Sequence, residues 1–412
     1  MLSSVPHENG RNDTMKITAL ETIRPDIQPN FLFVLLHTDS SLVGLGEAFF
    51  GARAVESYLH ETVAPALFAL SDPTPERAGT HLTSYLGYQG SGIETRGNGA
   101  IDLALWDLLG QQAELPLVRL LGGPCRDSIR AYNTCAGSGY VRTSTRQASA
   151  NWGLPANGRD GPWEDLAAFL ERPGELAAEL RAEGYTGMKV WPFDRAAEAS
   201  GGHEIGRSDL LEGLAVLEAI RDAVGHDLDL MVELHGLWDL RCATRILGEV
   251  SRFAPYWVED PMRADAVDAL ARLAGATDVP IAIGETAVGR RGFQPLLARG
   301  IVDVATVDIQ WTGGLTEACK VASMADAHGV PIAPHDCTGP VTFAAAVHLV
   351  CSQPNGLIQE TVRAFLRTWY TELVTGVPEV VDGTVAVGRS TGHGVRLHDD
   401  CRAAASTMLS RA

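Results

Sequence analysis

The sequence predicts an α/β protein in which a (β/α)8-type barrel, as in TIM barrels, follows an N-terminal α+β capping domain. From about residue 129 onwards, short apolar segments alternate with helical patterns, which is typical of parallel βα units. Eight such segments occur, and polar residues end several of them at regular spacings. The length of 412 residues suits one large domain and one smaller domain.

We divide the chain into four parts. The first residues are polar, and the last ones combine turn signals with weak alternation, which predicts a return to the capping domain. The parts are a polar N-terminal extension (1–14), the α+β capping domain (15–128), the barrel with the metal and catalytic residues (129–372) and the C-terminal segment (373–412).

The composition indicates a globular protein that acts on small molecules. Apolar residues make up 45% of the chain, too many for a disordered protein, and the net charge of -18 would repel nucleic acid or an anionic membrane. The seven cysteines are scattered without a CxxC pair, so we expect reduced thiols rather than disulfides or a zinc site. No segment is apolar for long enough to span a membrane, and we expect a cytoplasmic protein.

The capping domain begins with a predicted β-hairpin. Two β-rich segments, 31–37 and 42–50, flank a four-residue turn signal. Gly44 and Gly46 do not form a dinucleotide fingerprint, because no third glycine follows at the required spacing, and we interpret them as strand glycines. Helical patterns follow at 53–70, 74–86 and 98–112.

The barrel pattern consists of eight strands with helices such as 209–224 and 264–274 between them. Two connections are long, namely 137–163 after strand one and 193–208 after strand two. Long loops on the reactive face of a barrel are candidate lids, with surface insertions as the alternative. The predicted strands are 130–134, 187–191, 228–235, 256–259, 281–285, 304–310, 332–335 and 357–360.

The third strand carries the decisive pattern. Its alternation places leucines and a valine on the outer face, and Glu233 with His235 inside the barrel mouth. Glu259 and Glu285 end the next two strands, each 26 residues further on. Each glutamate alone would be an ion-paired strand-end residue, but three converging carboxylates repel one another unless a cation compensates them. Because all three ligands are oxygens, we predict a magnesium site.

Further polar residues end the last three strands. Asp308 ends strand six and His335 ends strand seven, and a carboxylate beside an imidazole is the arrangement of a general base. Glu360 ends strand eight. Strands three and seven lie opposite each other in an eight-stranded ring, so His235 and His335 are expected to flank whatever the metal holds.

Taken as an ordered set, these residues resemble the enolase superfamily, specifically its mandelate-racemase-like branch. The resemblance rests on Glu259-Asp260-Pro261, Gly284-Glu285-Thr286, the Asp308 and His335 pair and Glu360, and it covers most of the chain. It implies Mg2+ held by Glu233, Glu259 and Glu285, which binds a substrate carboxylate and stabilises an enediolate.

The second strand departs from the pattern of this branch. Lys189 falls where the branch carries the first lysine of a Lys-x-Lys pair, near the substrate carboxylate, and Trp191 replaces the second lysine. That second lysine is the base in racemases of the branch. His235, two positions after the first metal ligand, instead resembles the sugar-acid dehydratases of the galactonate and mannonate type.

The functional hypothesis is therefore the dehydration of an aldonate or aldarate to a 2-keto-3-deoxy acid. In it, Lys189 and the metal neutralise the carboxylate, His335 oriented by Asp308 removes the adjacent proton, and His235 protonates the departing β-hydroxyl. Glu360 is expected to bind the substrate carboxylate as a protonated acid. Aromatic side chains of 137–163 and polar groups around 24–30 and 49–54 are expected to cover the hydroxyls.

Two alternatives stay open. The opposed histidines also suit a racemase or epimerase of a 2-hydroxy acid, and Trp191 leaves open a barrel that binds metal and ligand without turnover. The sequence does not identify the sugar acid. The family resemblance further implies a homo-oligomer.

Overall fold

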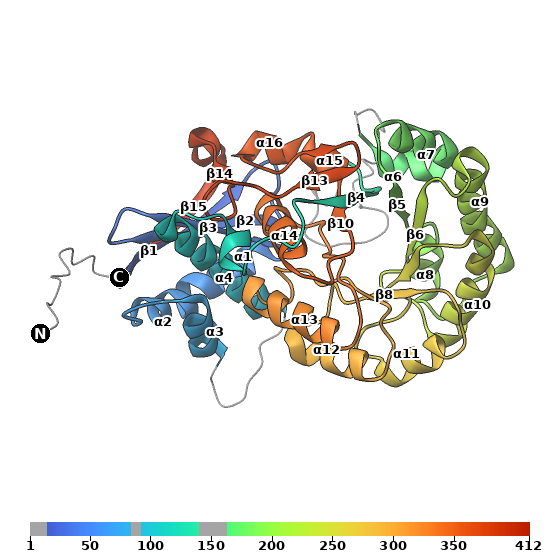
Figure 1. Cartoon of the computed structure of the whole chain (residues 1–412), viewed down its shortest axis with the longest axis horizontal. Coiled ribbons are helices and arrows are strands. Elements are labelled where there is room, and N and C mark those ends of the chain that lie inside the picture. The colour runs from blue at the N-terminus through green and yellow to red at the C-terminus, as the bar shows by residue number, and fades with distance from the viewer. Residues whose placement is uncertain (1–14, 84–91, 140–162) are drawn as a thin grey trace, which may run out of the picture.

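The computed structural model describes residues 15–83, 92–139 and 163–412, and shows a capping domain beside a barrel (Figure 1). The fold class is therefore α/β with a barrel, as predicted. The proposed extension 1–14 and nearly all of the proposed lid 137–163 lie outside the described residues. In this structure, none of the described helices is both long and apolar enough to cross a membrane.

The capping domain contains a four-stranded antiparallel sheet in the order β15-β1-β2-β3. The predicted hairpin is formed by β2 (Phe31–Thr38) and β3 (Val43–Phe49), and β1 (Ile17–Pro25) pairs with β2. The predicted helix at 53–70 is interrupted by a π-helical turn. The helices of this part are α1 (Ala52–Tyr58), η1 (Leu59–Val63), α2 (Ala64–Phe68), α3 (Pro75–Thr83), α4 (Gly92–Ala113) and α5 (Leu117–Leu120).

The glycines of β3 allow close packing of the sheet against α4. A Cβ atom on Gly46 would lie 2.0 Å from the carbonyl oxygen of Ala100, and one on Gly44 would lie 2.2 Å from that of Ala104. Both neighbours are backbone atoms of a buried helix, so they cannot move aside cheaply. The interpretation of these residues as strand glycines is confirmed.

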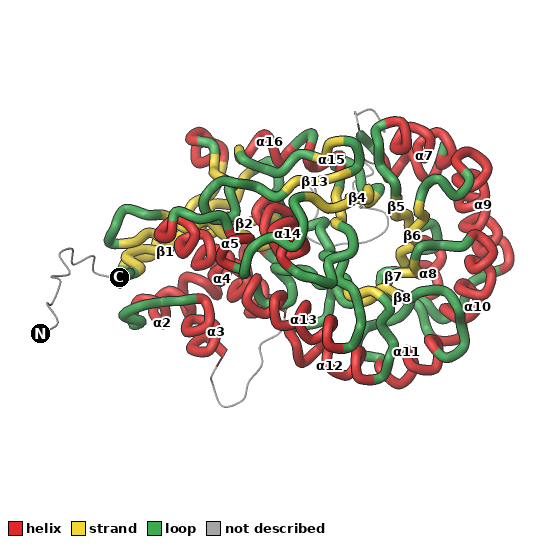
Figure 2. The backbone as a smooth tube through the Cα atoms, in the orientation of Figure 1, coloured by secondary structure: helices red, strands yellow, loops and turns green. Residues whose placement is uncertain are grey.

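The barrel strands run parallel in the order β4-β5-β6-β7-β8-β9. The last strand, β10, pairs in parallel with the first, β4. Helices surround these strands (Figure 2). The strands are β4 (Ser128–Thr134), β5 (Gly187–Val190), β6 (Asp229–Glu233), β7 (Trp257–Glu259), β8 (Ile281–Ile283), β9 (Val304–Ala305) and β10 (Gln359–Thr361).

Between β9 and β10 the ring is closed by isolated bridges instead of the predicted strand 332–335. Ile332 bridges to Ala305 and to Gly356, and His335 bridges to Asp308. The prolines at 331 and 334 lack the N–H groups that a regular ladder needs, which explains the interruption. The predicted strand 304–310 is likewise shortened to β9.

The outer layer of the barrel consists mainly of helices. The predicted loop 193–208 is not irregular throughout, because it contains the helix α8. The helices are α6 (Asp165–Glu171), α7 (Pro173–Ala182), α8 (Asp194–Ser200), α9 (Arg207–Val224), α10 (Leu240–Val250), η3 (Ser251–Phe253), α11 (Val267–Ala274), α12 (Gly289–Ala298), α13 (Leu315–Ala327), α14 (Pro340–Ser352), α15 (Arg363–Leu366) and α16 (Trp369–Leu373).

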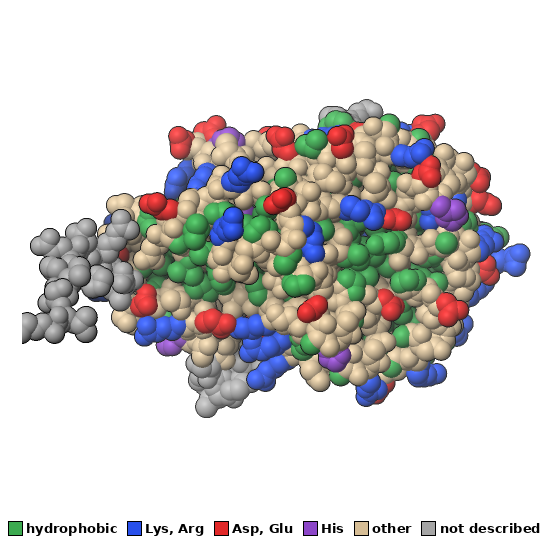
Figure 3. Space-filling view, in the orientation of Figure 1, with side chains coloured by type: hydrophobic (Ala, Val, Ile, Leu, Met, Phe, Trp, Pro, Cys, Tyr) green, Lys and Arg blue, Asp and Glu red, His purple; other side chains and the backbone are tan. Residues whose placement is uncertain are grey.

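The barrel interior is filled by side chains and is not a pore. A layer of buried residues contains one side chain from every strand position around the ring except β5, and a larger apolar core lies between the strands and the outer helices. On the face shown in Figure 3, hydrophobic side chains gather along the middle between acidic and basic ones. The inner layer consists of Tyr132, Met231, Trp257, Ala282, Val304, Ala333 and Ile358.

The C-terminal segment contacts the barrel before it reaches the capping domain. A hairpin of β12 (Val380–Val381) and β13 (Thr384–Ala386) adds to β4, and β11 (Val374–Thr375) pairs with β14 (Arg396–Leu397). After the 3-10 helix η4 (Asp399–Ala404), β15 (Ala405–Arg411) pairs antiparallel with β1 (Figure 1).

We predict that Gly46→Ala destabilises the protein by about 1–3 kcal/mol or more, because the new methyl group overlaps backbone atoms of α4. The measurement is the midpoint of urea unfolding followed by circular dichroism. Gly248→Ala in α10 is the control, since a Cβ there meets nothing within 4 Å, and it should be neutral or stabilising by up to about 1 kcal/mol. Equal midpoints for the two variants would contradict the packing described above.

Candidate functional site

Three glutamates meet at the C-terminal ends of neighbouring barrel strands. Glu233 and Glu259 are the last residues of β6 and β7 and are paired in register, and Glu285 follows β8 by two residues. One carboxylate oxygen from each glutamate lies within 4.8 Å of the others, and all three residues are buried. The structure thus brings together the three residues that the sequence assigned to a metal.

Lys189, on β5, is placed among the carboxylates. Its Nζ lies 3.3 Å from Glu233 Oε2, 3.0 Å from Glu259 Oε1 and 2.8 Å from Glu360 Oε1. Burial, together with the neighbouring carboxylates and in spite of Lys189, raises the pKa of Glu259 to about 8. One ammonium group is therefore too little positive charge for this cluster.

The donor set fits a hard divalent cation. Carboxylate oxygens are among the ligands that Mg2+ prefers. Three carboxylates leave coordination positions of the ion for water or substrate oxygens. Asp260, next to Glu259, is also buried, and burial with the charges of Glu285 and Glu233 raises its pKa well above the ordinary value. Added positive charge would relieve this repulsion.

His335 lies beside the cluster with its imidazole oriented by Asp308. Its Nδ1 is 2.8 Å from Asp308 Oδ2, and its Nε2 is 3.2 Å from Glu285 Oε2. The other oxygen of Asp308 accepts a hydrogen bond of 2.6 Å from the backbone N–H of Trp311. Burial opposes the charged imidazole, but the carboxylates of Glu285, Glu360 and Asp308 outweigh it and raise the pKa of His335 well above its usual value. With Nδ1–H bound to Asp308, Nε2 faces the site.

His235 lies just beyond the end of β6 and has a carboxylate partner of its own. A left-handed backbone conformation (φ 49°) turns it out of the strand, and its Nδ1 is 2.9 Å from Asp194 Oδ2. Burial opposes the charge of His235, but the carboxylates of Asp194 and Glu233 raise its pKa to about 9. Each of the two histidines thus has a buried aspartate at Nδ1.

Asp194 was missed in the sequence because its segment was interpreted as a loop. It is the first residue of α8, where an acidic residue is favourable for the helix dipole. The signal in the sequence was an aspartate four residues after β5, followed by Arg195 and two alanines. Trp191 has a structural role here, because its ring packs edge to face against the rings of His235 and Phe169. The ring centroids are 5.7 Å and 5.1 Å apart, respectively.

Glu360 is surrounded by hydrogen-bond donors. Oε1 contacts Lys189 and accepts a hydrogen bond from the Thr134 hydroxyl, and Oε2 accepts one of 2.8 Å from the backbone N–H of Asp336. Burial opposes ionisation, but Lys189 and His335 lower the pKa of Glu360 below its ordinary value. These donors favour the carboxylate form of Glu360 in this arrangement, and its protonation beside a bound substrate stays a prediction.

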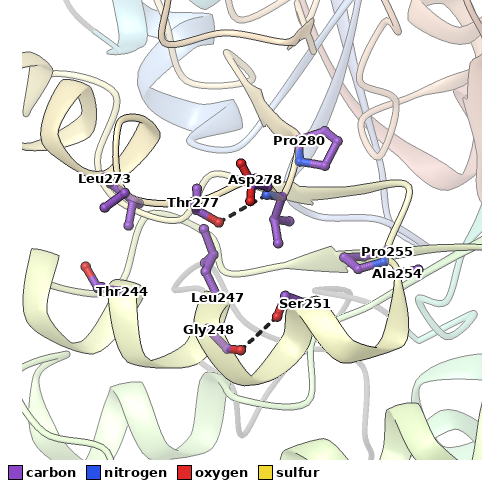
Figure 4. A pocket seen from close by; sticks show the side chains of 12 residues that line it. Thr244, Leu247, Gly248, Ser251, Ala254, Pro255, Leu273, Thr277, Asp278 and Pro280 are labelled. Atoms are coloured by element: carbon purple, nitrogen blue, oxygen red, sulfur yellow. Dashed lines mark hydrogen bonds between the residues drawn. The ribbon is translucent and has the colours of Figure 1, made fainter.

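A separate pocket, shown in Figure 4, lies at the opposite end of the barrel strands, between α10 and α11. Its lining includes Pro255 and Pro280, which precede β7 and β8, and Asp278 is its one titratable side chain. Its polar groups are satisfied locally, for example by the hydrogen bond from Val279 N to Thr277 Oγ1. Chemistry in (β/α)8 barrels occurs at the other end, so this pocket is not our candidate site.

Comparison with known proteins assigns the family. The model of the family described as "Enolase C-terminal domain-like" matches residues 173–401, and that of the "Mandelate racemase / muconate lactonizing enzyme, N-terminal domain" matches residues 14–122. The chain belongs to the enolase superfamily, in its mandelate-racemase-like branch. The resemblance inferred from the sequence is confirmed.

Curated relatives and solved structures agree with this assignment. The chain is 29% identical to a D-galactonate dehydratase of Xanthomonas campestris pv. campestris (strain B100), over 97% of this chain and 94% of the relative. It is 30% identical to that of Pectobacterium atrosepticum, over 84% and 81%. A crystal structure of an enolase of the mandelate racemase subgroup from Agrobacterium tumefaciens is 41% identical, covers 96% of this chain and 99% of that chain, and superposes with a TM-score of 0.84. A mandelate racemase/muconate lactonizing enzyme from Jannaschia sp. CCS1 is 30% identical over 96% and 97%, with a TM-score of 0.79.

We predict that the protein binds one Mg2+ per chain at the three glutamates, and that Glu259→Gln weakens this binding at least about tenfold, because it removes one charged ligand. Isothermal titration calorimetry measures the affinity. Glu218→Gln, at an exposed position of α9, is the control and should bind as the wild type does. Unchanged affinity in Glu259→Gln would place the metal elsewhere.

Proposed function

We propose that the protein is a Mg2+-dependent dehydratase of a sugar acid, which forms a 2-keto-3-deoxy acid. The observation that supports this most strongly is the pair of histidines beside the glutamate cluster, each with a buried aspartate at Nδ1. Elimination of water needs one group that removes the proton next to the carboxylate and another that protonates the leaving hydroxyl. The names of the curated relatives, D-galactonate dehydratases, support the same reaction.

Glu233, Glu259 and Glu285 would hold the metal. When bound, Mg2+ supplies positive charge that makes the proton next to the substrate carboxylate more acidic. Lys189 adds a fixed positive charge at the same place, since it is buried and held by three carboxylates. Glu360 anchors Lys189 and the backbone of Asp336, the residue after His335.

His335 is the proposed base. Its Nε2 faces the cluster, and the bond from Nδ1 to Asp308 keeps the ring in the orientation in which a neutral Nε2 accepts a proton. A cation held by Glu285 and its neighbours would offset the carboxylate charges that raise the pKa of His335, and so would favour this neutral form. His235 is the proposed acid, because Asp194 and Glu233 favour its protonated form. His335 takes the proton from the α-carbon, and His235 gives a proton to the β-hydroxyl, which leaves as water. The resulting enol then becomes the keto acid by losing its hydroxyl proton and gaining a proton at the β-carbon.

Racemisation is the second candidate, because two histidines with the same support also suit transfer of a proton across one carbon. Product analysis separates the two reactions, since only dehydration yields a keto acid. The alternative of a barrel that binds metal and ligand without turnover rested on Trp191. The ring of this residue packs against His235, so Trp191 gives that alternative no support. The expected homo-oligomer stays a prediction.

We predict that His335→Asn lowers keto-acid formation by about 10²- to 10⁴-fold, because it removes the base. Exchange of the α-hydrogen in deuterated water, followed by NMR, should be lost to the same extent. Thermal unfolding and Mg2+ binding of the variant serve as controls for folding and for the site. Turnover at the wild-type rate would refute the assignment of His335.

We predict that His235→Asn blocks elimination but retains exchange of the α-hydrogen, because it removes the acid and leaves the base in place. Asp194→Asn should show the same separation to a smaller extent, since it removes the partner that orients the His235 ring and favours its charge. Keto-acid formation and exchange are measured on the same samples.

Asp209→Asn in α9, away from the site, is the control for the Asp194 variant and should change neither rate. Loss of exchange together with elimination in His235→Asn would show that His235 does more than protonate the leaving group.

A further inference from the structure

Arg96 of the capping domain lies close to the pair of Asp308 and His335. It is in the first turns of α4, and this helix packs tightly on the loop that follows Asp308: a Cβ atom on Gly99 would lie 2.5 Å from the carbonyl oxygen of Gln310. The Arg96 guanidinium carbon is 5.3 Å from the centre of the Trp311 ring. The Trp311 ring is in turn 5.3 Å from the imidazole of His335. Arg96 is therefore connected to the proposed base, His335, through the ring of Trp311.

Arg96 has no anionic partner among the residues that the structure describes. Its Nε is buried and has no hydrogen-bond partner in the described part of the chain, and the same holds for the buried indole Nε1 of Trp311. A guanidinium group does not lose its proton in proteins, so a half-buried one without a counter-ion is unfavourable. Among the other half-buried or buried arginines of the described residues, Arg24, Arg363 and Arg396 have carboxylates beside them, and Arg126 and Arg221 donate to backbone carbonyls.

Nearby acids are already in use. Asp308 is close enough to Arg96 to raise its pKa, in opposition to burial, which is the stronger effect and lowers it. However, one oxygen of Asp308 accepts from Trp311 N and the other contacts His335 Nδ1. The Arg96 guanidinium and the Trp311 ring are thus in contact where the capping domain meets the reactive end of the barrel, and each has a buried N–H without a partner among the described residues. An anion from outside the chain would satisfy both donors.

We propose that Arg96 and the indole N–H of Trp311 bind the second carboxylate of a sugar diacid, so that the preferred substrate is an aldarate. This inference rests on the proposed function. One carboxylate would lie at Lys189 and the glutamate cluster, the other at Arg96, and the reacting carbons would face His335 between them. Phe50, whose ring is 5.9 Å from that of Trp311, supports the tryptophan from the capping domain. D-Galactonate, which the curated relatives are named for, has a single carboxylate.

The test compares aldonates and aldarates of matching configuration, such as galactonate with galactarate and gluconate with glucarate. Keto-acid formation is measured for the wild type, Arg96→Gln and Arg96→Lys. We expect the wild type to prefer a diacid, and Arg96→Gln to lower kcat/KM for it by about 10- to 100-fold, mainly through KM, because a charge-assisted contact is lost. The matched monoacid should change by less than about twofold, and Arg96→Lys should recover part of the loss.

Arg77→Gln is the control, since Arg77 is an exposed arginine of α3 in the same domain, and it should behave as the wild type. A wild type that dehydrates monoacids but no diacid would overturn this inference and leave the proposed function intact. An equal loss for both acids in Arg96→Gln would also overturn it, because the residue would then have a general structural role.

A binding measurement keeps the two proposals apart. Calorimetry with the His335→Asn variant and Mg2+ compares diacid and monoacid binding, with and without Arg96→Gln, in the absence of turnover. Diacid binding that depends on Arg96, in a protein that forms no keto acid from any sugar acid, would uphold the inference and refute the dehydratase proposal. Equal binding of diacid and monoacid would refute the inference.

Discussion

The crowding of buried carboxylates around one lysine is the constraint on which the site depends. Glu233, Glu259 and Glu285 converge because three neighbouring parallel strands end at the same edge of the barrel. Lys189 offsets only part of their charge, and burial together with the neighbouring carboxylates still raises the pKa of Glu259 to about 8. A hard divalent cation would fit this group of carboxylates, and the two histidines lie beside the same group.

Buried polar contacts fix the capping domain to the barrel. Glu47 of β3 accepts hydrogen bonds of 3.0 and 2.7 Å from the backbone N–H groups of Val341 and Thr342 at the start of α14, the helix that follows the His335 loop. Burial, which the hydrogen bonds only partly offset, raises the pKa of Glu47 to about 7. Asp102 of α4 similarly accepts from Thr316 N at 2.9 Å. The position of Arg96 relative to His335 is thus set by the fold.

The sequence was sufficient for the residues that recur once in each βα unit. Alternation placed Glu233 inside the barrel. The equal spacing to Glu259 and Glu285 predicted that these residues lie beside it, because the strand ends in a barrel share one face. The sequence was insufficient for contacts between elements that do not occupy equivalent positions in the repeated βα units. Asp194 reaches His235 from another βα unit, and Arg96 reaches Trp311 from another domain. The ionisation of Glu360 depends on donors such as the Asp336 N–H, which no pattern of residue types reveals.

The most direct test of the metal site is the anomalous diffraction from crystals grown with Mn2+, a hard divalent ion that replaces Mg2+ at oxygen sites. We expect one strong anomalous peak per chain, surrounded by carboxylate oxygens of Glu233, Glu259 and Glu285. A peak at another place, or none at these glutamates under saturating Mn2+, would contradict this expectation.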